Sequence, residues 1–412
     1  MEKKSKIQIS LATISLFIGS FSSELFTFAL GMYVLKVYKS SILFSLIIFI
    51  GPLFSFILSP FIGHLVDSFN HKKIVVLAQI ASVLVLLLGS YSLIIGNKTY
   101  FPIVIIIMSG LLEICDSFQT TAYKASTTGV VLKADQQRLI ALEQSVSIIS
   151  SLLGPIAGGS LFSAIPVVSF FIIDIIGEIV ALILMALLDF NLSGVATTGE
   201  QHKKKTVLLD FKEALSFIKG DKLLESMAFF AMFANFSLAS INVGIPYVLV
   251  TLFNTKSTIF GIIQALSAVG MLAASLLWSV KQIKKNLTSM TGVFGLLVTL
   301  TFFLFCLPLF TKINMSFTYG VSMLLLGMSV TSINMPVSIY IRTKVPFDIQ
   351  GRINVFFNST INILTPFGTA LFGVLFNKVS PIILFAITGV ILLILSVSML
   401  LMGHSQTEAA AD

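Results

Sequence analysis

Twelve long apolar runs, separated by short polar segments, make up almost the whole chain. A helix needs about 20 predominantly apolar residues to cross the hydrocarbon of a bilayer. Membrane-spanning strands instead alternate polar and apolar residues over about ten positions, whereas these runs are apolar on every face. The pattern therefore predicts twelve transmembrane helices, over 10–34, 41–63, 74–94, 102–125, 139–162, 166–188, 223–250, 257–280, 287–309, 316–341, 353–377 and 380–402.

The longest polar segment, 189–222, lies in the middle of the chain and leaves six runs on either side. A shift of about 211 residues lays the first six runs over the last six, and Pro155 then falls on Pro366. We therefore predict an all-α integral membrane protein of two parallel six-helix repeats. Its parts are an N-terminal bundle, a cytoplasmic central loop and a C-terminal bundle, over 1–190, 191–222 and 223–412.

The basic residues predict the orientation of these helices. If twelve helices alternate across the membrane, one side holds 20 Lys and Arg residues and the other holds 6. Because such an excess marks the cytoplasmic side, we expect a multi-pass protein of a bacterial-type cytoplasmic membrane with both termini in the cytoplasm. The segment Met1–Lys6 resembles the start of a signal peptide, but the following run is long and lacks a clear cleavage site. A retained helix is therefore predicted.

Composition narrows the class of protein further. Only 11% of the 412 residues are charged and 56% are hydrophobic, against about 25% charged in soluble chains. This excludes a soluble enzyme and a disordered scaffold. The net charge of +8 does not indicate nucleic-acid binding, because the positive residues lie in short loops between apolar runs. Cys115 and Cys306 lie inside apolar runs, without a disulfide framework or the spacing of metal ligands.

No phosphate-binding loop, zinc-protease motif or nucleophile elbow occurs along the chain. We therefore expect no enzymatic activity, no metal and no cofactor. Any transport would be driven by a gradient, with protons as the first candidate, or by a separate partner chain.

The segment from Gly63 to Lys73, between the second and third runs, reads Gly-His-Leu-Val-Asp-Ser-Phe-Asn-His-Lys-Lys. It resembles the loop motif of the major facilitator superfamily, Gly-x-x-x-Asp-Arg-x-Gly-Arg-Lys/Arg. The resemblance implies that Gly63 permits close helix approach, that Asp67 holds a cytoplasmic gate shut, and that Lys72 and Lys73 form its basic end. Arg, Gly and Arg of the family motif are here Ser, Asn and His, which predicts a thinner ion-pair network. The alternative is an ordinary short cytoplasmic loop.

A second motif lies in the fifth run, where Gly154-Pro155-Ile-Ala-Gly158-Gly159 resembles the antiporter motif of drug–proton exporters. Pro155 removes a helix hydrogen bond and bends the helix, and the glycines let another helix pack close. A tight, kinked contact of this kind could prevent proton leakage. Ser150 replaces an earlier glycine of the family motif. A kinked packing helix without a role in coupling is the alternative interpretation.

The segment Val345–Ile353 includes Gly351 and Arg352 and resembles the Val-Pro-x-x-x-x-Gly-Arg-Val loop of the macrolide-efflux branch of the superfamily. The segments Ser22–Gly31 and Phe171–Asp174 also resemble that branch. The resemblance covers nearly the whole chain. It implies the major facilitator fold, with a substrate site between the two repeats near the membrane midplane. Because the branch includes macrolide exporters and a siderophore exporter, the substrate stays open.

Five carboxylates inside the runs carry the prediction of a functional site. They are Glu24, Glu113, Asp116, Asp174 and Glu178, all in the first half of the chain. Ionisable residues at this depth are expensive and usually functional. No Lys or Arg lies deep in a run to pair with them. A carboxyl group in such surroundings can take up a proton on one side of the membrane and release it on the other.

Glu113 and Asp116 are three residues apart and share a helix face, which Gln119, Thr120 and Tyr123 continue. In the family the first and fourth helices line the central cavity. We therefore predict that Glu24, Glu113 and Asp116 bind protons and a cationic substrate. The fourth run lacks the Arg that many proton-coupled drug exporters carry there.

Asp174 and Glu178 are four residues apart on the sixth run, a helix that is usually peripheral in this family. They are included in the predicted proton and substrate site. A purely structural role as hydrogen-bonded acids is an equal alternative for this pair.

The resemblance and the acids together predict proton-coupled efflux of amphipathic, often cationic drugs, of the macrolide or multidrug kind, by a monomer in the lipid bilayer. One alternative is export of an endogenous metabolite, siderophore or lipid. Another, from a different class, is a membrane immunity or sensor protein that transports nothing.

Overall fold

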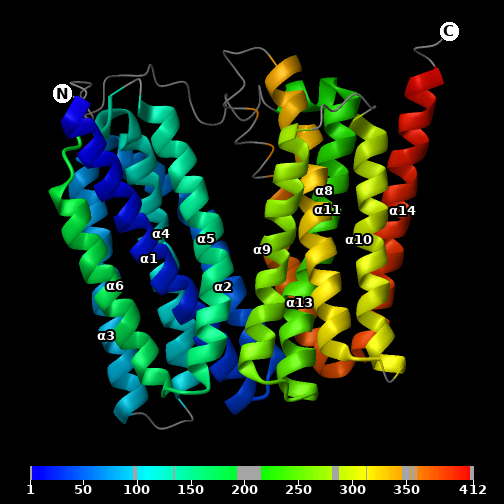
Figure 1. The fold of residues 1–412 in the computed structure, drawn as a ribbon, viewed down its shortest axis with the longest axis horizontal. Helices are drawn as coiled ribbons and strands as arrows, with labels where there is room; N and C mark the ends of the chain where they lie inside the picture. The colour runs from blue at the N-terminus through cyan, green and yellow to red at the C-terminus, as the bar shows by residue number, and fades with distance from the viewer. Residues whose placement is uncertain are drawn as a thin grey trace. The chain divides into compact units, whose positions relative to one another are not determined.

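The computed structural model describes residues 2–95, 100–132, 135–192, 215–280, 287–311, 313–345, 353, 357 and 360–408. Within these ranges the chain is helical, without strands (Figure 1). Eleven helical segments in the described ranges are long and apolar enough to span a membrane, and α2, with 28 residues, covers the remaining predicted run. The predicted helical membrane fold is thus confirmed.

Contacts divide the chain into two compact units. Unit 1 comprises Met1–Lys39, Leu46–His202 and Lys256–Gly261, and unit 2 comprises Ser40–Ser45, Lys203–Thr255 and Ile262–Asp412. Residues 193–214 of the predicted central loop lie outside the described residues, so the boundaries of that loop stay a prediction.

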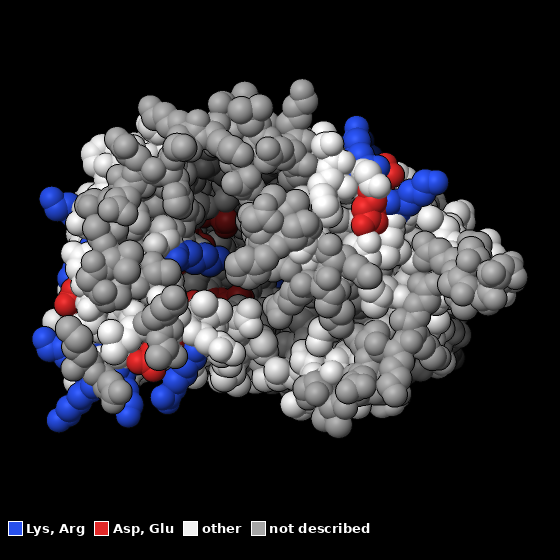
Figure 2. Space-filling model, turned by 90° about the horizontal axis from the view of Figure 1, so that it is seen from above, with Lys and Arg blue, Asp and Glu red and all other residues white. Residues whose placement is uncertain are grey.

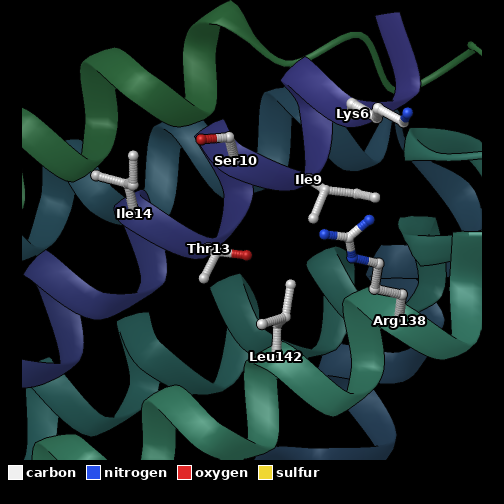
Figure 3. Close-up of a pocket in the computed structure, with 7 residues that line it drawn as sticks. All are labelled: Lys6, Ile9, Ser10, Thr13, Ile14, Arg138 and Leu142. Atoms are coloured by element: carbon white, nitrogen blue, oxygen red, sulfur yellow. The ribbon is translucent and has the colours of Figure 1, made fainter. Parts of the chain in front are cut away.

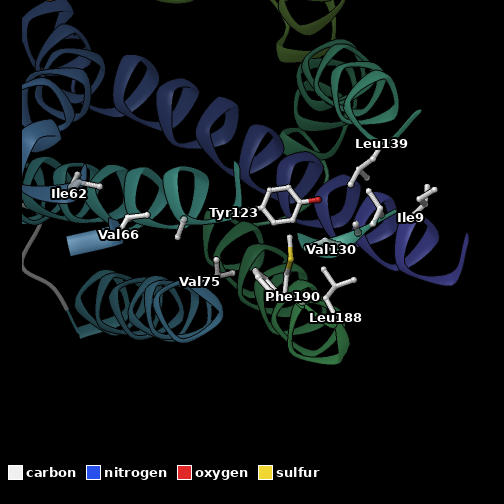
Figure 4. Packing of buried hydrophobic residues seen from close by; sticks show 13 residues of the cluster. Ile9, Ile62, Val66, Val75, Tyr123, Val130, Leu139, Leu188 and Phe190 are labelled. Atoms are coloured by element: carbon white, nitrogen blue, oxygen red, sulfur yellow. The ribbon is translucent and has the colours of Figure 1, made fainter. Parts of the chain in front are cut away.

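Unit 1 contains the helices of the first half of the chain, apart from Ser41–Ser45. It also contains Ser257–Gly261, which begin a helix that otherwise belongs to unit 2. The helices of the first half are α1 (Glu2–Val37), α2 (Ser41–Ser68), α3 (His71–Ile95), α4 (Phe101–Val130), α5 (Gln136–Phe162) and α6 (Val167–Leu187). Helix α1 packs against α5 and α6, and α3 packs against α4 and α6. One hydrophobic cluster lies at the end of the bundle where the chain begins. It includes the buried residues Ile9, Val66, Val75, Tyr123 and Leu139 (Figure 4).

Helix α6 shows why this bundle suits a lipid environment. Its exposed face carries Ile172, Ile176 and Ile183, each more than half exposed. Its buried face carries Asp174 and Gly177 among apolar residues. This is the reverse of a soluble helix, and it matches a bundle that keeps polar and small residues inside and apolar residues toward lipid.

Unit 2 contains the remaining helices, α8 (Lys222–Pro246), the π-helical turn η2 (Tyr247–Leu252), α9 (Ser257–Val280), α10 (Leu287–Phe310), α11 (Met315–Lys344), α13 (Thr365–Lys378) and α14 (Pro381–Glu408). Helix α10 packs against α11 and α14, and α8 packs against α13 and α14 (Figure 1). Asp221 begins α8 by accepting the backbone N–H groups of Leu223 and Leu224 at 3.0 and 3.1 Å, as expected of an N-cap residue.

The eleventh predicted run is not one unbroken helix. A turn at Ile363 and Leu364 separates a short helical stretch from α13, and Pro366 lies in the first turn of α13. Proline has no backbone N–H and its φ is fixed, so it suits the first turn of a helix and disrupts a helix interior. Hydropathy predicted the run, and the proline sets where the helix restarts.

Helices α9 and α11 cross at glycines. A Cβ atom added at Gly270 would overlap the backbone carbonyl oxygen of Leu324, and one added at Gly327 would overlap that of Ser267. Small residues allow such close backbone approach between membrane helices. The crossing therefore depends on both positions being glycine.

We expect Gly327→Ala to lower the unfolding temperature of the purified protein. Overpacking costs about 1–3 kcal/mol, which exceeds the gain in helix propensity of about 1 kcal/mol from replacing glycine by alanine. The control is Gly320→Ala on the same helix, where a Cβ would meet only the end of the Leu266 side chain, at 3.0 Å. Scanning fluorimetry in detergent compares the two, and equal unfolding temperatures would contradict the expectation.

Candidate functional site

Unit 1 encloses a cavity of about 570 Å³ that is lined by residues of all six of its long helices. The five predicted acids all line it, with Glu24 on α1, Glu113 and Asp116 on α4, and Asp174 and Glu178 on α6. Acidic side chains are visible in the depth of a hollow in Figure 2. The fold therefore brings together carboxylates that are up to 154 positions apart in the sequence.

The α4 face predicted from helical spacing is present. Gln119, Thr120 and Tyr123 line the cavity together with Glu113 and Asp116. These side chains recur with the period of the helix and form a polar stripe along one face of α4. Helix α2 contributes the apolar residues Ile47 and Ile48 to the same lining.

Glu113 has room because a glycine faces it. A Cβ atom added at Gly51 on α2 would lie 3.1 Å from Oε2, Cβ and Cγ of Glu113. Such a distance is tighter than ordinary van der Waals contact. Gly51 therefore lets α2 and α4 approach with a carboxylate side chain between them.

Asp174 is held in place by a neighbouring helix. It is 3% exposed, and its Oδ1 accepts a hydrogen bond of 2.8 Å from the hydroxyl of Ser22 on α1. Gly177, one turn further along α6, makes this approach possible, because an added Cβ would overlap the Ser22 hydroxyl. Asp174 thus has a fixed partner, as the structural interpretation of the α6 acids predicts.

Glu178 differs from Asp174 although both are on α6. The Glu178 carboxyl group interacts with the side chain of Gln79 on α3. No hydrogen bond of good geometry joins Glu178 Oε2, or either polar atom of Gln79, to another described residue. Unpaired buried polar groups carry a free-energy cost of about 1–3 kcal/mol, and their persistence is often connected with function. Of the two α6 acids, Glu178 is therefore the one whose environment suits a change of protonation.

Glu24 connects the cavity with the predicted antiporter motif. A Cβ atom added at Gly154 would lie 2.6 Å from Cβ of Glu24 and 3.3 Å from its carbonyl carbon. At Gly158 an added Cβ would lie 2.8 Å from the ring of Phe28, one turn further along α1. Pro155 lies inside α5, and Gly159 is buried there. Gly154 and Gly158 thus form the surface on which the acid-bearing helix α1 packs, whereas Gly159 faces the backbone of Ser257.

Glu143 on α5 is a sixth acid of this site, beyond the five predicted from the sequence. It lines the same cavity, and its Oε1 accepts a hydrogen bond of 2.9 Å from the Tyr123 hydroxyl. Its position inside the apolar run 139–162 was the sequence signal that could have found it. Lys124 also lines the cavity, so the site includes one cation from the end of α4.

The predicted gating loop is described in part. Lys72 donates from Nζ to the carbonyl oxygen of Leu188, at 2.8 Å, just past the end of α6. Asn70 stands where the family motif has glycine, and its side chain accepts the backbone N–H of Lys73 at 3.1 Å, which begins α3. Within unit 1 the loop therefore connects α3 with α6.

The structure does not support the packing predicted for Gly63, and some other motif residues lie wholly or partly outside the described residues. An added Cβ at Gly63 would have no described atom within 4 Å, so the close packing predicted for this glycine is absent among the described residues. The side chain of Asp67, and all of Gly351 and Arg352, lie outside the described residues. Their predicted roles stay predictions.

In the described part of the chain, no group of three or more His, Cys, Asp and Glu side chains is placed to hold a metal ion. The two cysteines there are both free. The cavity combines six carboxyl groups, the ammonium group of Lys124 and several hydroxyl groups with apolar side chains. Because the acids outnumber the one cation in this lining, the combination is suited to binding protons and organic cations.

Comparisons with known proteins agree with this architecture. The chain is 21% identical over 410 residues to macrolide efflux protein A of Streptococcus pyogenes, covering 96% of both chains. Among solved structures it resembles a D-xylose–proton symporter, with a TM-score of 0.70, 13% identity and coverage of 96% of this chain and 97% of that one. It also resembles a bacterial homologue of the iron transporter ferroportin in an inward-facing state, with a TM-score of 0.69, 12% identity and coverage of 96% and 98%.

The solved structures support the fold alone, because their sequences differ widely from this one. The family model for the Major Facilitator Superfamily matches residues 12–369, a range that contains the helices of unit 1 almost entirely and most of those of unit 2. The eleven apolar helices of the described residues that are long enough to span a membrane, together with this match, lead to one conclusion. The chain is a transporter, not an enzyme, and it belongs to the Major Facilitator Superfamily.

Proposed function

We propose that this transporter exports amphipathic, cationic organic molecules of the macrolide or multidrug kind, in exchange for protons, across a bacterial-type cytoplasmic membrane. The observation that carries the proposal is the gathering of six carboxylates around one cavity with apolar walls. The likeness to macrolide efflux protein A, at 21% identity, supports export as the direction and macrolides as the drug class. Both termini are assigned to the cytoplasm by the excess of basic residues on that side.

The proposed exchange follows from charge. While the acids are ionised, they attract a cation and the apolar wall accepts its hydrophobic part. Protonation from the outside removes the attraction, and the cation leaves. One proton that enters for each monovalent cation that leaves moves no net charge, so the pH gradient alone drives that exchange. Each further proton adds about 2.3 kcal/mol per 100 mV of membrane potential. No cofactor is needed for this cycle.

Export of an endogenous metabolite, siderophore or lipid is the second candidate within transport. The polar stripe on α4 suits a ligand with hydroxyl groups as well as a drug. Competition of candidate solutes against a fluorescent cationic dye in everted vesicles would separate the two. An immunity or sensor protein without transport would give no solute flux in proteoliposomes under an imposed pH gradient.

We expect the double variant Glu113→Gln/Asp116→Asn to lose drug-driven proton exchange while keeping its expression level. The amides preserve size and hydrogen bonding but cannot ionise. Resistance of a drug-sensitive bacterium to macrolides, and pH-driven dye flux in proteoliposomes, should both fall to the level of the empty control.

The matched control for this experiment is Glu225→Gln, which removes one exposed acid at the start of α8 in unit 2. Resistance and flux of this control should equal those of the wild type. Unchanged efflux with unchanged pH dependence in the double variant would refute the assignment of Glu113 and Asp116.

We expect the two α6 acids to respond differently to removal of charge. Asp174→Asn should retain flux, because its amide oxygen can still accept the hydrogen bond from Ser22. Glu178→Gln should fold normally but lose part of the pH dependence of flux, because its carboxyl group is replaced by an amide that cannot ionise. Flux measured across pH 5.5–8.5, a range of about three units around neutrality, checks both. The reverse order of effects would show that Asp174 carries the proton.

A further inference from the structure

A second pocket of about 310 Å³ lies at the beginning of α1 and α5, separate from the acid-lined cavity (Figure 3). Its lining residues are Lys6, Ile9, Ser10, Thr13, Ile14, Arg138 and Leu142. None of them lines the cavity that contains the carboxylates. Neither the pocket nor its two basic residues has a part in the exchange cycle proposed above.

The polar side of this pocket has the groups that bind phosphate. Lys6, Ser10 and Thr13 are spaced at four and three residues, so they lie along one face of α1, and Arg138 projects from the first turn of α5 toward that face (Figure 3). Arginine and lysine are the usual partners of phosphate oxygens. No carboxylate lines the pocket.

Thr13 gives a second indication of a ligand. Its hydroxyl oxygen is buried without a hydrogen-bond partner among the described residues, and Figure 3 shows it pointing toward the side where Arg138 lies. A threonine hydroxyl in a membrane helix commonly bonds to the carbonyl of the preceding turn. The nearest acid in sequence to Arg138, Asp135, already accepts the hydroxyl of Ser5 at 2.5 Å. The pocket therefore combines two cations with an unused donor.

The pocket extends along the membrane normal in a way that suits a lipid. Lys6 precedes the first apolar run, which begins at residue 10, whereas Ile14 lies inside it and is 47% exposed. At about 1.5 Å per residue, the eight positions between them span roughly 12 Å. Lys6 therefore lies at headgroup depth, and Ile14 lies where the acyl chains begin. Thr13, the residue before Ile14, lies at the boundary between the two.

We propose that this pocket binds the phosphate of an anionic phospholipid. Lys6 and Arg138 face the phosphate, Thr13 donates to one of its oxygens, and an acyl chain packs along Ile9, Ile14 and Leu142. Basic pockets between transmembrane helices on the cytoplasmic side are suited to anionic headgroups, and these helix ends lie on the side with the basic excess. The site does not depend on which substrate is transported.

The test uses the full-length protein in detergent, titrated with phosphatidylglycerol, with phosphatidylcholine and with inorganic phosphate. Native mass spectrometry counts bound lipid, and scanning fluorimetry records the stabilisation that a bound ligand produces. We expect phosphatidylglycerol to bind and stabilise the wild type, and the other two probes to do neither at the same concentration.

The variant Lys6→Gln/Arg138→Gln should weaken phosphatidylglycerol binding about 30-fold, since each basic residue near an anionic headgroup contributes roughly a factor of five. The matched control is Lys3→Gln/Lys4→Gln, which removes two exposed charges from the same end of α1 but leaves the pocket lining intact. The control should bind like the wild type. Equal weakening in both pairs would overturn the site, because it would show a general effect of surface charge.

Thr13→Val tests the pocket without changing charge or side-chain size. It should weaken phosphatidylglycerol binding about tenfold, because a hydrogen bond to a charged group contributes roughly that factor. It also serves where the charge variant fails to fold. Undiminished lipid binding in Thr13→Val and in the charge variant would overturn the proposal. Binding of inorganic phosphate as tightly as phosphatidylglycerol would overturn the assignment to a lipid and indicate a site for free anions.

Discussion

A carboxyl group inside the hydrocarbon of a membrane must be surrounded by protein, and the packing of unit 1 depends on this requirement. Exposing one acid to lipid at mid-membrane costs about 2.5–3.5 kcal/mol even by insertion-based scales. A glycine in a helix costs about 1 kcal/mol relative to alanine. The cost of a glycine that lets two helices enclose an acid is therefore smaller than the cost of exposing that acid to lipid. In unit 1, glycines at three positions allow helices to pack closely around acids or their partners.

Each of these glycines lies on a different helix. Gly51 on α2 faces Glu113, Gly154 on α5 faces Glu24, and Gly177 on α6 faces Ser22, the partner of Asp174. Unit 2 uses its glycines differently. There, Gly270 and Gly327 bring helix backbones together, and aromatic contacts such as Phe305 with Phe385, ring centroids 5.9 Å apart, fill the interior. The membrane acids and the packing that accommodates them are thus concentrated in one unit.

The helices could be predicted from the sequence because the bilayer itself fixes their length and their composition. The polar face of α4 could be predicted as well, since Glu113, Asp116, Gln119, Thr120 and Tyr123 follow the helical period. Pairings between helices could not be predicted in this way. That Gly154 faces Glu24 depends on the relative register of α1 and α5, which no local pattern in either segment specifies.

The roles of some loop residues could not be predicted from the sequence either, because the same residue type suits more than one role. Lys72 counts as one more positive charge at the cytoplasmic rim, yet its ammonium group binds the carbonyl of Leu188 at the end of α6, where a cation is favoured by the unpaired carbonyls of the last turn. Asn70 departs from the family motif, yet it begins α3 by accepting a backbone N–H. Such contacts depend on where a chain end meets another helix, which only the folded structure specifies.

The contact between Gly154 and Glu24 has a consequence for coupling. Because a Cβ atom added at Gly154 would lie 2.6 Å from Cβ of Glu24, a change in the bend of α5 at the neighbouring Pro155 would alter the space around Glu24. A bend that tightens this space and one that relaxes it will bind a proton at Glu24 with different affinity, since burial penalises the charged form. By thermodynamic reciprocity, protonation of Glu24 must then shift the preferred bend of α5 by the same free energy. The predicted antiporter motif and the proposed proton-binding residue Glu24 therefore lie on the two sides of one helix contact, and a movement of α5 at Gly154 changes the surroundings of Glu24.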